Sequence, residues 1–263
     1  MVKGGRSMKF QAQYINNIIS KGSRIDGRKI DEHRKITIEK DVVEQAEGSA
    51  KVKLGETEVV VGVKMDVGEP FPDTPNEGVL IVNAELSPLA SPEFELGPPR
   101  EEAIELARIV DRGIRESNCI DREKLCIKKG EKVWLIFVDI QPLNHDGNLI
   151  DASGIAAIEA LLNTKMPEYD AKNEVVNYEK KKVKLPVKEK PIPVTLAQIN
   201  DKLVADPGIE EEDVMTSRIT IVTKENGNIC AIQKGGRSGF LMESIEEAIE
   251  TAVKKGKEIR KML

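Results

Sequence analysis

Apolar and polar side chains alternate early in the chain, and this two-residue period constrains the fold more than any other feature. The alternation runs through Ile36–Glu39 and Ala50–Leu54, continues in the valine-rich Thr57–Val67, and returns in Val79–Leu86. Successive side chains of a strand point to opposite faces of a sheet, so these segments predict four strands with a buried face.

The pattern then changes to a helical period. Pro98-Pro99 suits a helix entrance, and Arg100–Ser117 places apolar residues on one side of a helix. Val133–Leu143 reads as a buried strand, and a second helix is expected from Asp151, as its N-cap, to Asn163. Several strands followed by helix, strand and helix indicate an α+β fold.

A lysine-rich stretch separates this region from a second one with a similar order of elements. Beyond it, we expect strands at Ile192–Ile199 and Leu203–Ala205, a hairpin around Asn226-Gly227, and a final helix after Ser244. Near the start of the chain, Phe10–Ser20 predicts a docking helix. The resulting division is an N-terminal extension with its docking helix (1–24), a first domain (25–166), a lysine-rich connection (167–190) and a second domain (191–263).

Composition narrows the class of protein. The 263 residues are 40% hydrophobic and 32% charged with a net charge of −5, which excludes a disordered chain. No apolar run approaches the ~20 residues of a membrane span, and no signal-peptide pattern is present, so no membrane partner is expected. Three cysteines without metal-type spacing indicate reduced thiols and a cytoplasmic protein. A nucleic-acid partner stays open, because a balanced total charge can hide a basic patch.

Three arginines form the most suggestive basic feature. At ~100° per helical residue, Arg108, Arg112 and Arg115 fall within an arc of ~60°. Guanidinium groups on one stripe can bind successive phosphates of a nucleic acid. The alternative is a solvated face, because Glu101 and Glu105 share the stripe and can pair with the arginines. Spacing alone favours this alternative.

Other clusters point less clearly to chemistry. Asp206 with Glu210–Asp213 could hold Mg²⁺, although such clusters are more often exposed loops. Gly235–Gly239 could bind an anion through its amides, although a turn between strand and helix also needs glycines. Neither His33 nor His145 belongs to a nucleophile–base arrangement. We therefore expect no catalytic residue, no metal site and no cofactor.

Several contiguous motifs are more specific than these patterns. They are Arg24-Ile25-Asp26-Gly27-Arg28, Ala46–Ala50, Gly68–Pro75, Pro88–Pro92 and Ile104–Ser117. The first two, with an arginine at the following strand start, resemble the opening of the ribonuclease PH family. Together the motifs resemble the non-catalytic ring subunits of archaeal-type RNA exosomes, and the resemblance extends from about Ile25 to the final helix.

The resemblance implies a fold of two β-α-β-α-type halves with mixed sheets and packed helices. It also implies a hexameric ring of three heterodimers, in which this chain alternates with a catalytic paralogue. Such a ring degrades RNA from its 3′ end, using inorganic phosphate to release nucleoside diphosphates. RNA-binding cap subunits sit on one face of the ring.

Departures from the family pattern imply that this chain is the non-catalytic subunit. Catalytic members carry a phosphate-binding loop with a hydroxyl residue and an arginine, and the matching Asp146–Asp151 has neither. Asp206 matches the first residue of the family's aspartate pair, and the second falls near Glu212 or Asp213. The resemblance also assigns Arg108 and Arg112 to RNA bound at the neighbouring subunit, with Arg115 as a weaker third.

Two other hypotheses stay open at this point. The chain could be an autonomous phosphate-dependent 3′-to-5′ exoribonuclease, with Asp206 and Glu212 or Asp213 around Mg²⁺ and Arg237 gripping phosphate. It could also be a binding protein unrelated to RNA, which only the general pattern supports.

Overall fold

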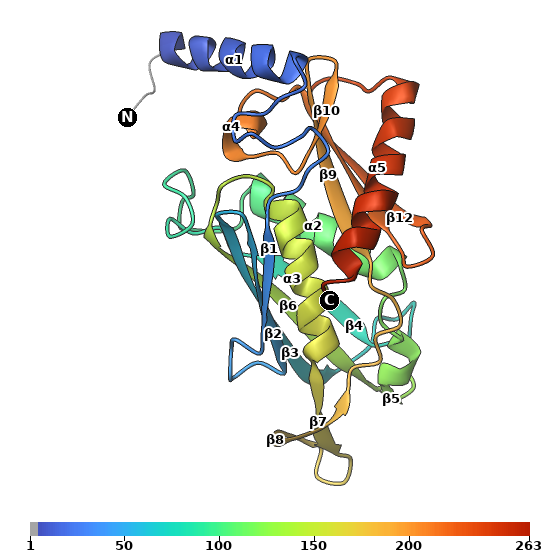
Figure 1. Cartoon of the computed structure of the whole chain (residues 1–263). Coiled ribbons are helices and arrows are strands. Elements are labelled where there is room, and N and C mark those ends of the chain that lie inside the picture. Colours follow the sequence, from blue (N-terminus) through green and yellow to red (C-terminus); the bar gives the residue numbers. More distant parts are fainter. Residues whose placement is uncertain (1–4) are drawn as a thin grey trace.

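The alternating segments form the first sheet of the protein, as predicted. A computed structural model describes residues 5–263 and shows a six-stranded sheet in the order β1-β2-β3-β6-β4, with β5 also paired to β6 (Figure 1). Neighbouring strands are antiparallel except β4 and β6, which are parallel. The strands are β1 (Ile36–Lys40), β2 (Gly48–Leu54), β3 (Thr57–Gly68), β4 (Val79–Ala84), β5 (Cys126–Lys128) and β6 (Lys132–Asn144).

Helices α2 (Glu101–Glu116) and α3 (Leu149–Asn163) pack on this sheet, and a short 3₁₀ helix (Arg122–Leu125) precedes β5. Almost every residue of α3 is buried, because the helix contacts β2 and β3 on one side and β9 of the second domain on another (Figure 1). A helix that is apolar all round suits such a position. The central helix therefore belongs to the cores of both domains.

The predicted N-cap of α3 is wrong. The cap is Asn148, whose side chain accepts a hydrogen bond from the amide of Asp151. Asn148 has a φ of 51°, in the left-handed region that asparagine tolerates, so the helix begins three residues earlier than predicted. Asp151 lies in the first turn instead and is fully buried.

The second domain repeats the order of strands and a final helix, and the α+β prediction is confirmed. Its antiparallel sheet has the order β10-β9-β11-β12. The elements are β9 (Ile192–Ile199), β10 (Lys202–Ala205), α4 (Ile209–Glu212), β11 (Ser217–Thr223), β12 (Ile229–Gly236) and α5 (Met242–Arg260). The turn at Asn226-Gly227 joins β11 to β12, and Gly227 has the positive φ (85°) for which glycine is favoured.

The lysine-rich connection contains a hairpin that the sequence pattern did not predict. Strands β7 (Lys165–Asp170) and β8 (Val175–Lys184) pair with each other and form a separate two-stranded sheet. The hairpin projects from the end of the molecule opposite α1 (Figure 1). Its register shifts around Pro167, and polar residues occupy both faces of β8, so the two-residue period is lost there.

The predicted helix near the start of the chain is present as α1 (Gly5–Ser20). Ile15 and Ile19 are fully buried and form a small apolar cluster with residues of β9 and β10. The helix is thereby attached to the second domain. No helix within residues 5–263 is long and apolar enough to cross a membrane.

We predict that Gly154→Ala weakens the contact between the two domains. A methyl group there would overlap the ring of Pro193 on β9, and overpacking of this kind costs about 1–3 kcal/mol. The higher helix propensity of alanine offsets about 1 kcal/mol, so a net loss of up to about 2 kcal/mol is expected in urea unfolding. Gly62→Ala is the control, because no atom lies within 4 Å of its new methyl group. Equal stability of the two variants would contradict the prediction.

Candidate functional site

The loop that begins α3 is tied down by the protein's own side chains. The three amides of Asp146–Asn148 donate in order to Thr57 Oγ1 (3.1 Å), His145 Nδ1 (3.3 Å) and Glu212 Oε1 (2.9 Å). Thr57 also donates to the carbonyl oxygen of Gly147 (2.6 Å). Backbone amides before a helix are common anion-binding groups, and here they already have acceptors.

Two carboxylates occupy the space at the start of α3. Asp151 accepts hydrogen bonds from the amide of Thr195 (2.9 Å), from its hydroxyl (2.8 Å) and from Asn148 Nδ2 (2.8 Å). Burial raises the pKa of Asp151 to about 7, and it raises the pKa of Glu212 to about 7 as well. The helix end that would attract an anion is therefore lined by acidic groups, and the loop itself contributes no lysine or arginine.

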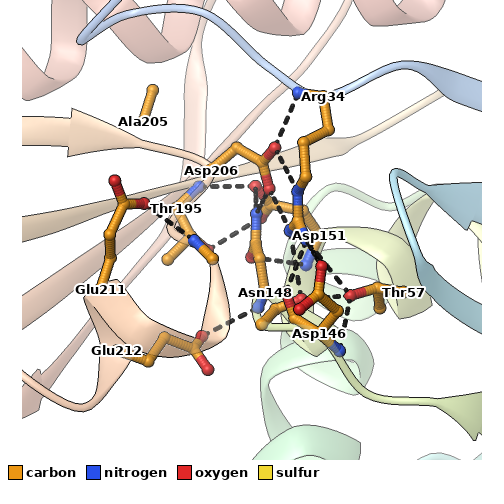
Figure 2. Close-up of polar contacts among 12 residues, drawn as sticks. Arg34, Thr57, Asp146, Asn148, Asp151, Thr195, Ala205, Asp206, Glu211 and Glu212 are labelled. Carbon is orange, nitrogen blue, oxygen red and sulfur yellow. Dashed lines mark hydrogen bonds and ion pairs between the residues drawn. The ribbon is translucent and has the colours of Figure 1, made fainter. Parts of the chain in front are cut away.

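Asp206, which follows β10, is the centre of a larger network (Figure 2). Its fully buried carboxylate accepts from Arg34 Nη2 (2.7 Å), Arg34 Nε (2.9 Å), Arg28 Nη1 (2.9 Å) and Asn148 Nδ2 (2.8 Å). Burial on its own would raise the pKa of Asp206, but hydrogen bonds and charge from Arg34 outweigh it and lower the pKa to about 2. The carboxylate is therefore ionised and fully paired within the protein.

A second arginine–carboxylate pair lies beside the first. Arg24 and Glu211 are both buried, and Arg24 Nε donates to Glu211 Oε1 (2.9 Å), with a second, shorter contact between Nη2 and Oε2. Arg24 also donates to the carbonyl oxygens of Ala205 (2.7 Å) and Asp206 (2.8 Å). We call the segment 24–34 the arginine strap, because its three arginines bind the second domain.

These contacts correct the expectation that the acidic cluster is an exposed loop, and they do not favour the alternative of a Mg²⁺ site. Asp206 and Glu211 are buried and bound by arginines, and only Glu210 and Asp213 are exposed. Across residues 5–263, no group of three or more His, Cys, Asp or Glu side chains could hold a metal ion. The signal in the sequence that could have revealed this burial is the three arginines of the strap, because a buried carboxylate needs a cation beside it.

The three arginines of α2 differ in how they are engaged. Arg108 is exposed and forms no hydrogen bond or ion pair with the described residues. Arg112 is half-buried and donates to Gln233 Oε1 on β12 (3.1 Å). Arg115 donates to both oxygens of Asp111 (2.7 and 3.1 Å) and to the carbonyl oxygen of Leu80 on β4 (3.1 Å). Helix α2 thus lies between the outer strands of both sheets.

The carboxylates expected to neutralise this stripe do not do so. Glu105 pairs instead with Arg218 on β11, at 2.5 Å, and Glu101 is exposed at the start of the helix. In the described part of the chain, no ion pair joins Glu101 or Glu105 to Arg108 or Arg112. The charge of Arg108 is available to an external anion.

Gly236 in the glycine-rich segment is explained by its backbone, because its φ of 83° lies in the left-handed region and a Cβ there would lie 2.6 Å from Ser217 Cα. Arg237 is exposed, and no contact within residues 5–263 links it to Asp206 or Glu212. The hypothesis of an autonomous nuclease placed Arg237 beside these carboxylates, and the structure shows no contact between them in residues 5–263.

Comparison with known proteins matches both halves of the chain to one family. Residues 32–167 match domain 1 of the 3′ exoribonuclease family, and residues 190–255 match its domain 2. A protein of Pyrococcus horikoshii named exosome complex component Rrp42 is 53% identical over 252 residues, which cover 95% of this chain and 92% of the relative. Its namesake in Methanothermobacter thermautotrophicus is 49% identical over 242 residues, covering 92% and 89%.

Solved structures agree with the sequence relatives. A chain of the Archaeoglobus fulgidus exosome with RNA bound to the active site has a TM-score of 0.91 and 48% identity, covering 97% of this chain and 98% of that one. Rice Rrp46 shares the fold at 17% identity, with a TM-score of 0.69 over 90% of this chain and 97% of its own. The chain thus belongs to the 3′ exoribonuclease family, the ribonuclease PH family, and carries both of its domains.

Proposed function

We propose that this chain is a non-catalytic subunit of an exosome-type hexameric ring. In this proposal three copies alternate with three copies of a catalytic paralogue, as three heterodimers, and the ring degrades RNA phosphorolytically from the 3′ end. The support is the name and the extent of the relatives that are about half identical to this chain. RNA-binding cap subunits on one face and a cytoplasmic location are part of the same proposal.

The start of α3 is the single observation that carries the non-catalytic assignment. Inorganic phosphate needs amide and cationic donors, and here the amides of Asp146–Asn148 are already bonded while Asp151 and Glu212 face the helix end. Charge-assisted donors supply much of the stabilisation in phosphoryl transfer. With its amides already bonded and no lysine or arginine of its own, the loop offers the attacking phosphate neither a free amide nor a cation.

The burial of Asp206 supports the same conclusion, because the carboxylate cannot reach a substrate. A general acid or metal ligand needs a carboxylate that can reach the substrate, whereas Asp206 is fully buried and its oxygens accept from Arg28, Arg34 and Asn148. The structure therefore favours a packing role for Asp206 over the autonomous-nuclease hypothesis.

The proposal that the ring binds RNA through this chain relies mainly on Arg108 and Arg112 of the arginine stripe on α2. Among the described residues, Arg108 has no partner for its guanidinium and Arg112 is held only by the neutral Gln233, so both can bind phosphates. Arg115 is a third member of the stripe, but Asp111 and Leu80 already take up its donors, and we expect it to contribute least.

The proposal is tested by RNA decay in phosphate buffer. The chain alone is expected to release no nucleoside diphosphate, and addition of the catalytic paralogue is expected to give a ring that does. The paralogue alone sets the baseline. Phosphorolysis by the purified chain without its partner would contradict the assignment, as would failure of the two chains to co-elute as a ring.

We predict that Asp206→Asn destabilises the fold by about 3 kcal/mol at pH 7, because two partly buried arginines lose the buried carboxylate that pairs with them. The pKa of Asp206 is lowered from 3.8 to about 2 on folding, so its stabilising effect is present above pH 4 and lost as the pH falls towards 2. The difference in unfolding free energy between variant and wild type should narrow over that interval. Asp201→Asn, at an exposed aspartate, is the control. If the difference in unfolding free energy did not change with pH, the charge of Asp206 would not be the cause of the destabilisation.

We predict that the double variant Arg108→Gln/Arg112→Gln weakens RNA binding by the assembled ring about tenfold, or ~1.4 kcal/mol. The slope of log affinity against log salt should fall by about 1.4, at ~0.7 for each lost phosphate contact on single-stranded RNA. Lys257→Gln on the exposed face of α5 removes a positive charge elsewhere and is the control. Binding and ring formation are measured separately, and an unchanged slope in an intact ring would exclude these two arginines from the RNA site.

A further inference from the structure

A groove of about 960 Å³ lies at the end of α2 that is opposite the arginine stripe. It is bounded by the ends of β4 and β6, by the loop that follows β4, and by the first turn of α2. We call it the α2 groove. Apolar side chains form part of its lining: Ala84, Leu86, Phe94, Ala103 and Ile104. Its volume exceeds that of any one side chain, so it can take a segment of polypeptide.

Exposed apolar residues mark this region as incompletely covered. Ile104 lines the groove and is 49% exposed, and Leu96, between two residues that line it, is 77% exposed. Leu89, in the same loop, is 73% exposed. Strand β4 is the last strand on this side of the sheet, so no further strand of the described chain lies beside it. Exposed apolar side chains near a sheet edge are typical of protein interfaces.

The charges around the groove decide what kind of partner fits. Its lining includes six exposed carboxylates: Glu85, Glu93, Glu95, Glu101, Glu102 and Asp139. The one cation in the lining, Arg100, is already paired with Glu95. Such a surface repels the phosphates of RNA and attracts lysine and arginine, and complementary potentials of this kind select and orient protein partners.

The neighbour in the ring is the partner whose position agrees with this chemistry. The proposed role of Arg108 requires the neighbour to lie beside α2, and the groove lies at the other end of the same helix. We propose that the α2 groove docks a basic segment, with apolar side chains, of the catalytic paralogue. This inference rests on the proposed function and adds the surface through which the ring assembles.

The test reverses three of the charges, in Glu93→Lys/Glu101→Lys/Glu102→Lys. The matched control makes the same change in net charge on α5, in Glu243→Lys/Glu246→Lys/Glu247→Lys, at residues that are also exposed. Binding to the catalytic paralogue is measured by calorimetry and by gel filtration. The groove variant should bind at least tenfold more weakly than the wild type, and the control should bind as the wild type does. Equal binding by the two variants would overturn the proposal.

Leu96→Asn is a second variant that leaves the start of α2 intact and adds no charge, and the leucine side chain is too exposed to be needed for folding. It should weaken binding at least fivefold, whereas Leu241→Asn, at a leucine that is 71% exposed outside the groove, should not. Normal assembly of Leu96→Asn would count against the proposal. A groove variant that assembles normally but loses RNA affinity would overturn it in favour of an RNA surface.

Hydrogen exchange tests the same surface without a substitution. Amides of β4 and of residues 93–104 should exchange at least tenfold more slowly in the ring than in the free chain, while those of the β11–β12 turn should not change. Unchanged exchange in an assembled ring would overturn the groove assignment and leave the proposed function standing. Failure of the wild-type chain to bind the paralogue would overturn both.

Discussion

The buried carboxylate of Asp206 is the interaction on which the arrangement of the two domains depends. It lies in the second domain, yet it accepts hydrogen bonds from Arg28 and Arg34 of the strap and from Asn148 of the first domain. Arg34 also donates to the carbonyl oxygen of Asp146 (2.6 Å), so one side chain links the strap, the loop and the second domain. A buried charge is tolerated only when it is paired, and here the partners come from two parts of the chain outside the second domain, the strap and the loop before α3.

The same contacts support the proposal that this chain is the non-catalytic subunit. The loop before α3 must hold Asn148 in a left-handed conformation so that its side chain reaches both Asp151 and Asp206. Glu212 accepts a hydrogen bond from the amide of Asn148, so this amide at the start of the helix is no longer available to an anion. In the proposed function, this arrangement leaves the arginine stripe of α2 as the surface that binds RNA.

Periodicity predicted the elements whose signal is local, and it failed where distant residues decide the structure. The valines of β3, the apolar face of α2 and the turn at Asn226-Gly227 are each explained within a few residues. Asp206 and Arg34 are far apart in sequence, so an exposed acidic loop was the reasonable expectation for the cluster. The cap of α3 was missed for the same reason, because Asn148 is held in place by the second domain as well as by its own helix. Of the candidate site, the sequence located the arginine stripe, but only the structure shows which of its members is free.

Helix α2 carries acidic residues at its start and basic residues at its end, an order that the helix dipole favours by itself. The dipole accounts for Glu101 and Glu102 in the first turn and for Arg115 in the last. It does not account for the carboxylates that face the same groove from β6 and from the loop after β4, because they lie on other elements. Nor does it account for Arg108, which lies in the middle of the helix without a partner among the described residues. The dipole thus explains only the charges at the helix termini, and the remaining charges agree with the two proposals above, in which a basic polypeptide binds at one end of α2 and RNA binds along the rest.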